Sequence, residues 1–235
     1  MKRVEAVLCD FDDTLIDSSA VARMASDSVA REIARDMHPT SPASTIRRLL
    51  TAIRETGEEM ERSLEFNRNL WWVEVLQRVN AKVAASSEAL RRWTKRYWEE
   101  YAKGRPFPDV VSTLEAMRGY SLGIVTNTDG TPGVKRRRIS VSGLERYFSA
   151  VVVGGEDGVM LKPHPQPFLM AASQLAVSPK QCLVVGDKPF SDVRGAKRAG
   201  MLVTLVMRRD WPDLENPDYV IHSLSELLSV LRSID

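Results

Sequence analysis

Residues 4–14 read VEAVLCDFDDT, a short apolar stretch that ends in a cluster of acidic residues. An apolar run of this length, bounded by acidic residues, is typical of a strand that is buried on both faces. Side chains two residues apart on a strand point to the same side, so Asp10 and Asp12 are expected to project together. The stretch therefore predicts a central strand that carries two carboxylates at its carboxyl end.

Similar apolar runs recur along the chain and alternate with helical patterns. The further runs are residues 122–126, 150–153, 182–185 and 202–207, and the helical patterns are residues 110–117, 165–176, 191–199 and 223–231. This alternation predicts the α/β class, with a Rossmann-like, doubly wound parallel sheet covered by helices on both faces. In such folds the functional groups collect at the carboxyl ends of the strands.

An inserted segment, residues 17–105, interrupts the alternation, because it contains amphipathic helical patterns and no convincing strand. Aromatic residues recur at every fourth position from Trp93 to Tyr101, as a helix face packed in a core requires. The sequence thus predicts an all-helical cap domain of residues 17–105, inserted into a Rossmann-like core domain of residues 1–16 and 106–235.

Two neighbouring tryptophans, Trp71 and Trp72, lie inside this segment. Successive helical residues point about 100° apart, so the two indoles are not expected to share the centre of one buried stripe. Packing in the core or at its boundary is favoured for the pair. The alternative is that one of them faces the active site or a partner.

The composition is that of a globular protein, with 43% hydrophobic and 27% charged residues and a net charge of +2. This balance predicts no nucleic-acid partner and no anionic membrane partner. Cys9 and Cys182 lie in apolar runs, which indicates buried free thiols and a reducing, cytoplasmic setting. The apolar stretch before Asp10 is too short for a signal peptide or a membrane span. Nothing in the sequence indicates the oligomeric state.

The paired carboxylates can divide the chemistry of phosphoryl transfer. Asp10 is expected to bind a cation and attack phosphorus, while Asp12, kept protonated by like-charge repulsion, donates a proton to the leaving oxygen. The alternative interpretation is a strand end at which an aspartate or Thr14 only caps the next helix.

Polar residues also follow two later strand patterns. Thr126 and Asn127 supply a hydroxyl and an amide that suit phosphate oxygens, although Asn127 also favours a simple turn. The ammonium of Lys162 is expected to hold the nucleophile and the phosphoryl group together, the alternative being a surface lysine in a proline-stiffened turn. His164 lies between two prolines and is interpreted as a helix-entry residue outside the chemistry.

Another pair of carboxylates follows residues 182–185. Asp187 is expected to complete an oxygen-ligand set for Mg²⁺, which binds few carboxylates and retains waters. Asp192 is either a helix cap or an acid that orients Lys162 or a metal-bound water from outside the ligand set.

These motifs, in this order, resemble those of the haloacid dehalogenase-like (HAD) hydrolase superfamily. The match consists of residues 10–14, Thr126, Lys162 and residues 186–192, and it extends over the whole chain, because members often carry a helical cap after the first motif. The resemblance implies a Mg²⁺-dependent phosphatase that acts on a small phosphorylated metabolite through an aspartyl-phosphate.

The resemblance also implies a role for each matching residue. Asp10 would be the nucleophile, and Asp12 would act as general acid and base. The metal ligands would be Asp10, Asp187 and the backbone carbonyl of Asp12. Thr126 and Lys162 would hold the phosphoryl oxygens.

Several alternatives remain open at this point. A phosphomutase of the β-phosphoglucomutase type shares every motif, whereas a haloacid dehalogenase needs no acid at Asp12, and a non-catalytic binding protein needs neither aspartate. A local cationic run of Lys135 and residues 136–138 is interpreted as a solvated helix face, the alternative being that it steers anionic substrates.

Overall fold

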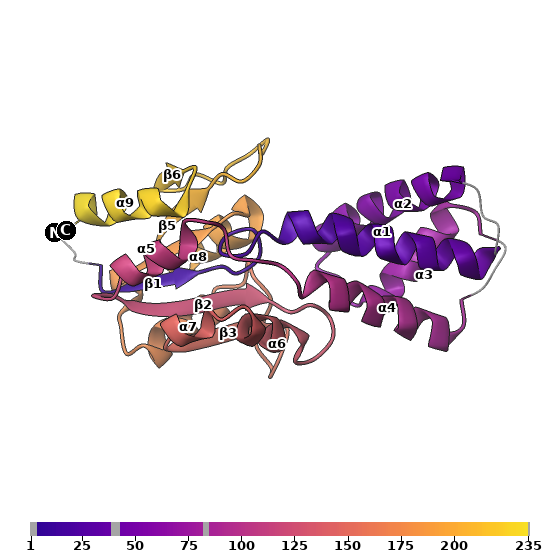
Figure 1. Ribbon diagram of the computed structural model, residues 1–235. Helices are drawn as coiled ribbons and strands as arrows, with labels where there is room; N and C mark the ends of the chain where they lie inside the picture. The colour runs from indigo at the N-terminus through magenta and orange to yellow at the C-terminus, as the bar shows by residue number, and fades with distance from the viewer. Residues whose placement is uncertain (1–3, 39–42, 82–84, 235) are drawn as a thin grey trace. The chain divides into compact units, whose positions relative to one another are not determined.

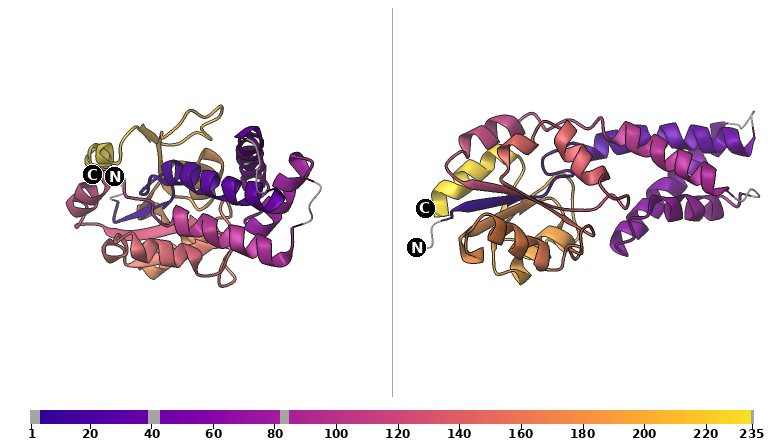
Figure 2. Two further views of the ribbon diagram at one scale, coloured as in Figure 1. Left: turned by 45° about the vertical axis from the view of Figure 1, so that its right-hand side comes forward. Right: turned by 90° about the horizontal axis from the view of Figure 1, so that it is seen from below.

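The computed structural model describes residues 4–38, 43–81 and 85–234, and the chain forms two compact units. The sheet unit consists of Met1–Asp17, Arg105–Thr128 and Lys135–Asp235, and the helical unit consists of Ser18–Gly104 and Asp129–Val134. Figure 1 draws the elements of both units, and Figure 2 shows them from two further directions.

The sheet unit is built on six parallel strands in the order β3-β2-β1-β4-β5-β6. Their bounds are β1 Ala6–Cys9, β2 Ser121–Asn127, β3 Ala150–Gly154, β4 Cys182–Gly186, β5 Leu202–Val206 and β6 Tyr219–Ile221. The order runs outward in both directions from β1 and β4, so the connections pass over opposite faces of the sheet. The predicted doubly wound α/β fold is confirmed, and β6 is a strand that the sequence pattern did not indicate.

Helices cover both faces of this sheet, as Figure 1 shows. On one face α5 (Val110–Ala116), α6 (Val134–Val141) and α9 (Leu227–Ile234) share a hydrophobic core with Val7 and Cys9 of β1. On the other face α7 (Gln166–Gln174) and α8 (Arg194–Arg198) pack with Ala6 and Leu8. Alternate residues of β1 thus enter opposite cores, which is why the whole strand is apolar.

The helical unit consists of α1 (Ser18–Met37), α2 (Ala43–Arg62), α3 (Arg68–Arg78) and α4 (Ser87–Tyr101), as far as the chain is described. The side chains of Asn67 and Ser86 accept hydrogen bonds from the first turns of α3 and α4, and so cap them. On the predicted aromatic face of α4, Trp93 and Tyr97 are buried in the core of this unit, and Tyr101 is partly buried and packs against that core.

Both Trp71 and Trp72 are buried, so the favoured packing of the pair in the core or at its boundary is confirmed. Trp72 packs in the core and donates to Thr94 Oγ1 at 2.8 Å. Trp71 donates to the carbonyl of Glu65 at 2.9 Å, and its ring lies where a side chain at Gly57 would touch it at 3.3 Å. Helix α3 is therefore covered on more than one side, which a single-stripe argument does not foresee.

A short loop, Asp129–Val134, groups with the helical unit although it lies within residues 106–235. At Gly130 the backbone has a φ of +76°, and an added Cβ would lie 1.7 Å from the carbonyl oxygen of Phe66. Only glycine permits this conformation and this close approach of two backbones.

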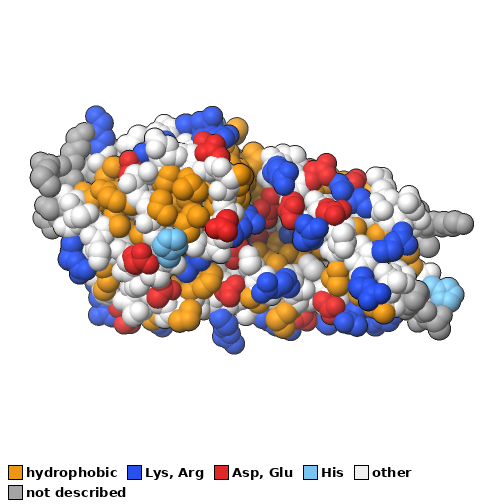
Figure 3. Space-filling model, turned by 90° about the horizontal axis from the view of Figure 1, so that it is seen from above, with side chains coloured by type: hydrophobic (Ala, Val, Ile, Leu, Met, Phe, Trp, Pro, Cys, Tyr) orange, Lys and Arg blue, Asp and Glu red, His pale blue; other side chains and the backbone are white. Residues whose placement is uncertain are grey.

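The surface and the thiols agree with the composition. On the face drawn in Figure 3, side chains of Lys and Arg are interspersed with those of Asp and Glu. Cys9 and Cys182 are free and buried, as expected. Over residues 4–38, 43–81 and 85–234, no helix has the length and apolar character that a membrane crossing requires.

Candidate active site

The site lies at the point where the strand order reverses, between β1 and β4. The backbone N–H of Asp10 donates to the carbonyl of Val185 at 2.9 Å, so the ends of these two strands are held together. Asp187 follows the last residue of β4, and Asp192 lies in the π-helical turn Pro189–Val193. A Cβ at Gly186 would lie 2.4 Å from the Asp192 carboxyl group, so the glycine allows Asp192 to reach the site.

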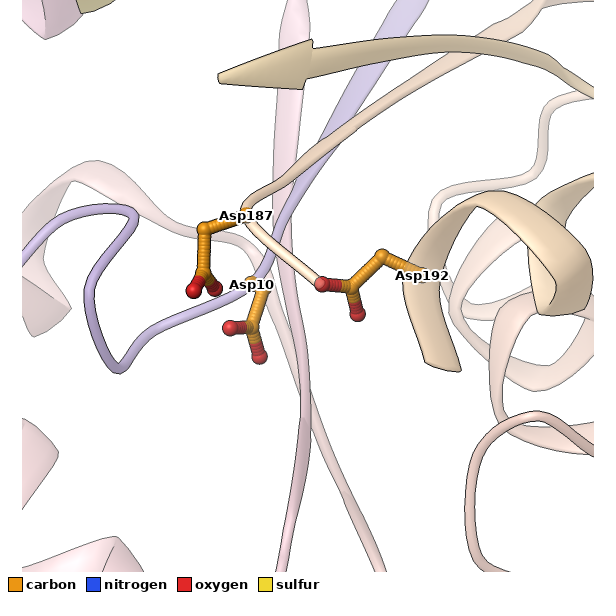
Figure 4. Close-up of side chains that lie close together, drawn as sticks. All are labelled: Asp10, Asp187 and Asp192. Carbon is orange, nitrogen blue, oxygen red and sulfur yellow. The ribbon is translucent and has the colours of Figure 1, made fainter. Parts of the chain in front are cut away.

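Three of the predicted carboxylates come together here. Asp10, Asp187 and Asp192 are all buried, and each offers an oxygen within 4.8 Å of the others. Figure 4 shows the carboxylates of Asp10 and Asp187 next to each other beyond the strand ends, with that of Asp192 approaching from the following turn. Burial, together with the negative charges of Asp10 and Asp192, raises the pKa of Asp187 well above its usual value.

Lys162 supplies the positive charge in this cluster. Its ammonium donates to Asp10 Oδ1 at 2.6 Å, to Asp192 Oδ1 at 2.6 Å and to the carbonyl of Val125 at 2.9 Å. Burial opposes the charged form, but Asp10 and Asp192 outweigh it and raise the pKa of Lys162. The alternative of a surface lysine is therefore wrong, because all three ammonium protons have buried acceptors.

Asp192 is held from two sides. It accepts from Lys162 and also from the backbone N–H of Lys188 at 3.0 Å. Burial raises the pKa of Asp192, and Lys162 opposes the shift. Its contacts are those of an acid that orients Lys162, one of the two expected arrangements.

The two residues at the end of β2 have different surroundings. Thr126 is buried near the end of β2, at 2% exposure. Asn127 accepts from the backbone N–H of Lys162 at 2.8 Å and donates to its carbonyl at 3.2 Å. Asn127 thus fixes the backbone of Lys162 through these two hydrogen bonds, which the sequence did not suggest.

Asp12 has an environment opposite to the expected one. Its carboxylate forms ion pairs with Lys135 and Arg138 of α6, the second including an Arg138 Nη1 contact at 3.2 Å. Although burial favours the neutral acid, these two cations outweigh it and hold the pKa of Asp12 well below its usual value. The expectation that like-charge repulsion keeps Asp12 protonated is therefore wrong for this state of the protein.

Lys135 and Arg138 are site residues that the sequence analysis missed. Both are buried, at 3% and 4% exposure, whereas Arg136 lies outside and pairs with Asp157 at 3.2 Å. The interpretation of the whole run as a solvated helix face is thus wrong for Lys135 and Arg138. Their spacing of three residues was the available signal, because such side chains share a helix face.

The donors beside Asp10 fit a hard divalent cation. Asp187 accepts one hydrogen bond, from Thr14 at 3.4 Å, and no ion pair to it is found in the described part of the chain. Lys162 balances only part of the negative charge of Asp10, Asp187 and Asp192. Oxygen donors with excess negative charge are the set that Mg²⁺ prefers.

The sequence and the fold both match known proteins. Residues 4–200 match the model of the haloacid dehalogenase-like hydrolases. This chain belongs to the haloacid dehalogenase-like hydrolase family, and it is an enzyme of that family. The resemblance seen in its motifs is thereby confirmed.

Relatives extend over essentially the full length. A glyceraldehyde 3-phosphate phosphatase from Methanopyrus kandleri is 32% identical over 98% of this chain and 98% of its own length. A phosphoglycolate phosphatase from Salmonella paratyphi A is 33% identical over 98% of this chain and 94% of its own. The crystal structure of a 2-haloacid dehalogenase from Pseudomonas syringae pv. Tomato DC3000 has a TM-score of 0.68 and 27% identity, covering 99% of this chain and 100% of that one.

Proposed function

We propose that this enzyme is a Mg²⁺-dependent phosphatase that hydrolyses a small phosphate monoester through an aspartyl-phosphate on Asp10. The observation that carries the proposal is the contact of Lys162 with both Asp10 and Asp192 at 2.6 Å, beside the buried carboxylate of Asp187. This arrangement provides a nucleophile, a fixed positive charge and a cation site at one sheet edge.

In the first half of the reaction Asp10 is the nucleophile. One of its carboxylate oxygens attacks phosphorus, the bond from phosphorus to the ester oxygen breaks, and Asp12 gives a proton to the departing alcohol. Lys162 and the Thr126 hydroxyl hold the phosphoryl oxygens and stabilise their negative charge. Asn127 contributes indirectly, by fixing the backbone of Lys162.

The ion pairs of Asp12 suit the second half of the reaction. An ionised Asp12 accepts a proton from the water that attacks the aspartyl-phosphate, and Lys135 and Arg138 favour that form. In the first half Asp12 must be protonated. The negative charge of a bound phosphate ester favours the protonated form of Asp12, because it opposes ionisation of a neighbouring carboxylate.

Mg²⁺ would be held by Asp10, Asp187 and the backbone carbonyl of Asp12, and when bound it supplies charge neutralisation and alignment of the phosphoryl group. The buried oxygen donors and the raised pKa of Asp187 support this assignment. A cation at this position stabilises the ionised form of Asp187, which burial alone disfavours.

The nature of the relatives supports a small substrate. The two relatives described above that are more than 30% identical to this chain are named as phosphatases of phosphoglycolate and of glyceraldehyde 3-phosphate, both of which are short phosphorylated metabolites. A phosphomutase shares the same residues and differs only in passing the phosphoryl group to a sugar instead of water. A dehalogenase is disfavoured, because halide leaves without the proton that Asp12 supplies.

Release of inorganic phosphate from p-nitrophenyl phosphate and from a panel of small phosphate esters tests the proposal. We expect turnover with Mg²⁺, loss of turnover with EDTA, and a decrease on the order of 10³-fold or more in Asp10→Asn. Asp157→Asn is the matched control, because the Asp157 side chain is 75% exposed. Full activity of Asp10→Asn, or transfer of phosphate to a sugar in place of release, would overturn the proposal.

A further inference from the structure

Arg208 lies two residues after β5, at the carboxyl edge of the sheet, and its side chain contacts two segments that are far apart in the sequence. Its Nη2 donates to the backbone carbonyl of Thr14 at 3.4 Å, and its guanidinium carbon lies 3.8 Å from the ring centre of Phe107. The side chain is 16% exposed, and Nη2 also lies 4.0 Å from Asp109 Oδ1. All four residues belong to the sheet unit.

The two segments that Arg208 contacts are also joined to each other. The backbone N–H of Phe107 donates to the carbonyl of Leu15 at 3.1 Å, and that of Asp17 donates to the carbonyl of Arg105 at 3.0 Å. These are the segments by which the chain leaves the sheet unit after β1 and returns to it. Arg208 thus contacts both members of a hydrogen-bonded pair of segments.

Thr14 connects these contacts with the carboxylates of the candidate active site. Its side chain is fully buried, and its hydroxyl donates to Asp187 Oδ1 at 3.4 Å. Its carbonyl, on the backbone, is the acceptor for Arg208. Asp12, whose backbone carbonyl is assigned to Mg²⁺ above, lies two residues before Thr14 in the same turn. The placement of Thr14 therefore bears on two of the assigned metal ligands.

The position of Arg208 carries a cost in stability. Its Nε is buried without a hydrogen-bond partner among the residues that the structure describes. A buried donor without an acceptor lowers the free energy of unfolding. Proteins tolerate such violations mainly at functional sites, so an arginine kept in this place is expected to have a role beyond stability.

We propose that Arg208 is a positioning residue of the Mg²⁺ site. It fixes the carbonyl of Thr14, and through the Thr14 hydroxyl it orients Asp187 for the cation. This inference rests on the proposed function, which assigns Asp187 to Mg²⁺. Groups that hydrogen-bond a metal ligand hold it in its orientation and contribute to metal affinity. Charge alone predicts the opposite sign, because a cation near the site repels Mg²⁺ and its removal would tighten binding.

The first measurement is calorimetric titration of the whole, metal-free protein with Mg²⁺. We expect Arg208→Met to raise the Kd for Mg²⁺ by about 3- to 10-fold, the usual loss for one hydrogen bond. Arg209→Met is the matched control, because Arg209 is exposed, carries the same charge and stacks on Trp211 at 3.9 Å. Its Kd should stay within about twofold of the wild type. A Kd for Arg208→Met that equals or falls below that of the wild type refutes the positioning role.

The second measurement tests whether Arg208 acts through Thr14. Thr14→Val removes the hydroxyl and keeps the shape of the side chain, and we expect it to raise the Kd for Mg²⁺ by about 10-fold. Addition of Arg208→Met to this variant should then change the Kd by less than about twofold, because the two residues act in one chain of contacts. Equal effects of Arg208→Met in both backgrounds would show that Arg208 acts by another route, contrary to the proposal.

The third measurement, hydrogen exchange in EDTA, needs neither metal nor catalysis. The amide hydrogens of Asp17 and Phe107 should exchange faster in Arg208→Met than in the wild type or in Arg209→Met. Arg208→Lys, which keeps the charge without the planar donors, should change exchange and Kd in the same direction, and it serves if Arg208→Met does not fold.

The outcomes separate this inference from the proposed function. Failure of the wild type to bind Mg²⁺ would remove the metal from the proposed function and the positioning role with it. Binding by the wild type with the same Kd in both Arg208 variants would remove the positioning role alone. A merely structural arginine gives that second result even if exchange is faster, since stability and metal affinity are then separate.

Discussion

The ammonium of Lys162 is shared by two carboxylates and a backbone carbonyl, all of them buried. Lys162→Met would leave Asp10 and Asp192 without their common counter-charge, so we expect a loss of about 3–5 kcal/mol in the free energy of unfolding as well as loss of phosphatase activity. Urea denaturation of the metal-free protein measures the first effect. Lys180→Met, at an exposed position, is the control and should change little.

A second prediction at the residue scale concerns the ion pairs of Asp12. Its lowered pKa stabilises the fold at pH values above the unfolded value of about 3.9, and this contribution is lost as the pH falls through the folded pKa. Arg138→Met should therefore lower the free energy of unfolding at neutral pH. On acidification, the free energy of unfolding of this variant should fall by less than that of the wild type. The acidic limb of its pH–activity profile should also move to higher pH, because Asp12 then ionises less readily.

The control for this prediction lies on the same helix. Arg137 is exposed and one residue away from Arg138, so Arg137→Met changes the net charge equally and does not touch Asp12. Identical pH profiles of unfolding for Arg137→Met and Arg138→Met would contradict the role that we assign to the ion pairs.

At the scale of the elements, the ends of β1 and β4 bring carboxylates together, which lowers the stability of the metal-free protein. Because the pKa of Asp187 is raised by folding, the folded protein binds that proton more tightly than the unfolded chain, and stability of the metal-free protein falls as the pH rises above about 3.9. A difference of one between the folded and the unfolded pKa corresponds to about 1.4 kcal/mol in the free energy of unfolding. Asp187→Asn should thus melt at a higher temperature than the wild type in EDTA at neutral pH.

Mg²⁺ should reverse the comparison, because it would stabilise the ionised carboxylate only where Asp187 is present. We expect added Mg²⁺ to raise the melting temperature of the wild type and to leave that of Asp187→Asn almost unchanged. Equal stabilisation of both proteins would show that the cation binds elsewhere.

The two strands also carry the free thiols. Burial raises the pKa of Cys182 to about 11, and it raises that of Cys9 further, so neither is a thiolate near neutral pH. We expect both thiols to resist a disulfide reagent in the native protein and to react once guanidinium chloride unfolds it. Rapid reaction of either thiol in the native state would contradict their burial.

Prediction from sequence succeeded where a local pattern determines the structure. The strands β1, β2 and β4 are short apolar runs, and their burial on both faces makes them recognisable without any knowledge of their neighbours. Strand β6 has only three residues and is partly exposed, so it lacks that signal. Helix α6 begins with a basic run that has the appearance of a surface segment.

The contacts within the site were harder to predict from the sequence than the residues that form it. Spacing from the strand ends indicated Asp10, Asp187 and Lys162, because parallel strands deliver their carboxyl ends to one edge. It could not indicate that α6 turns Lys135 and Arg138 toward Asp12, since that depends on how a helix is rotated against the sheet. The pKa of Asp12 was misjudged for the same reason.

At the scale of the whole molecule, the loop Asp129–Val134 depends on its glycines. Gly130 and Gly133 have nearly the same φ, +76° and +77°, but an added Cβ meets the backbone of Phe66 at Gly130 and nothing within 4 Å at Gly133. Alanine costs about 1–2 kcal/mol at either position for its left-handed conformation. Gly130→Ala should lower the melting temperature more than Gly133→Ala, and the difference measures the close approach.

The division of the chain has a practical consequence for engineering. The helical unit is formed by two separate stretches, Ser18–Gly104 and Asp129–Val134, and the second of them contains Gly130 against Phe66. A chimaera that transplants residues 18–104 onto another member of the family would leave behind the loop that this unit contacts. Exchange of both stretches together is the design that preserves the native backbone contact at the graft.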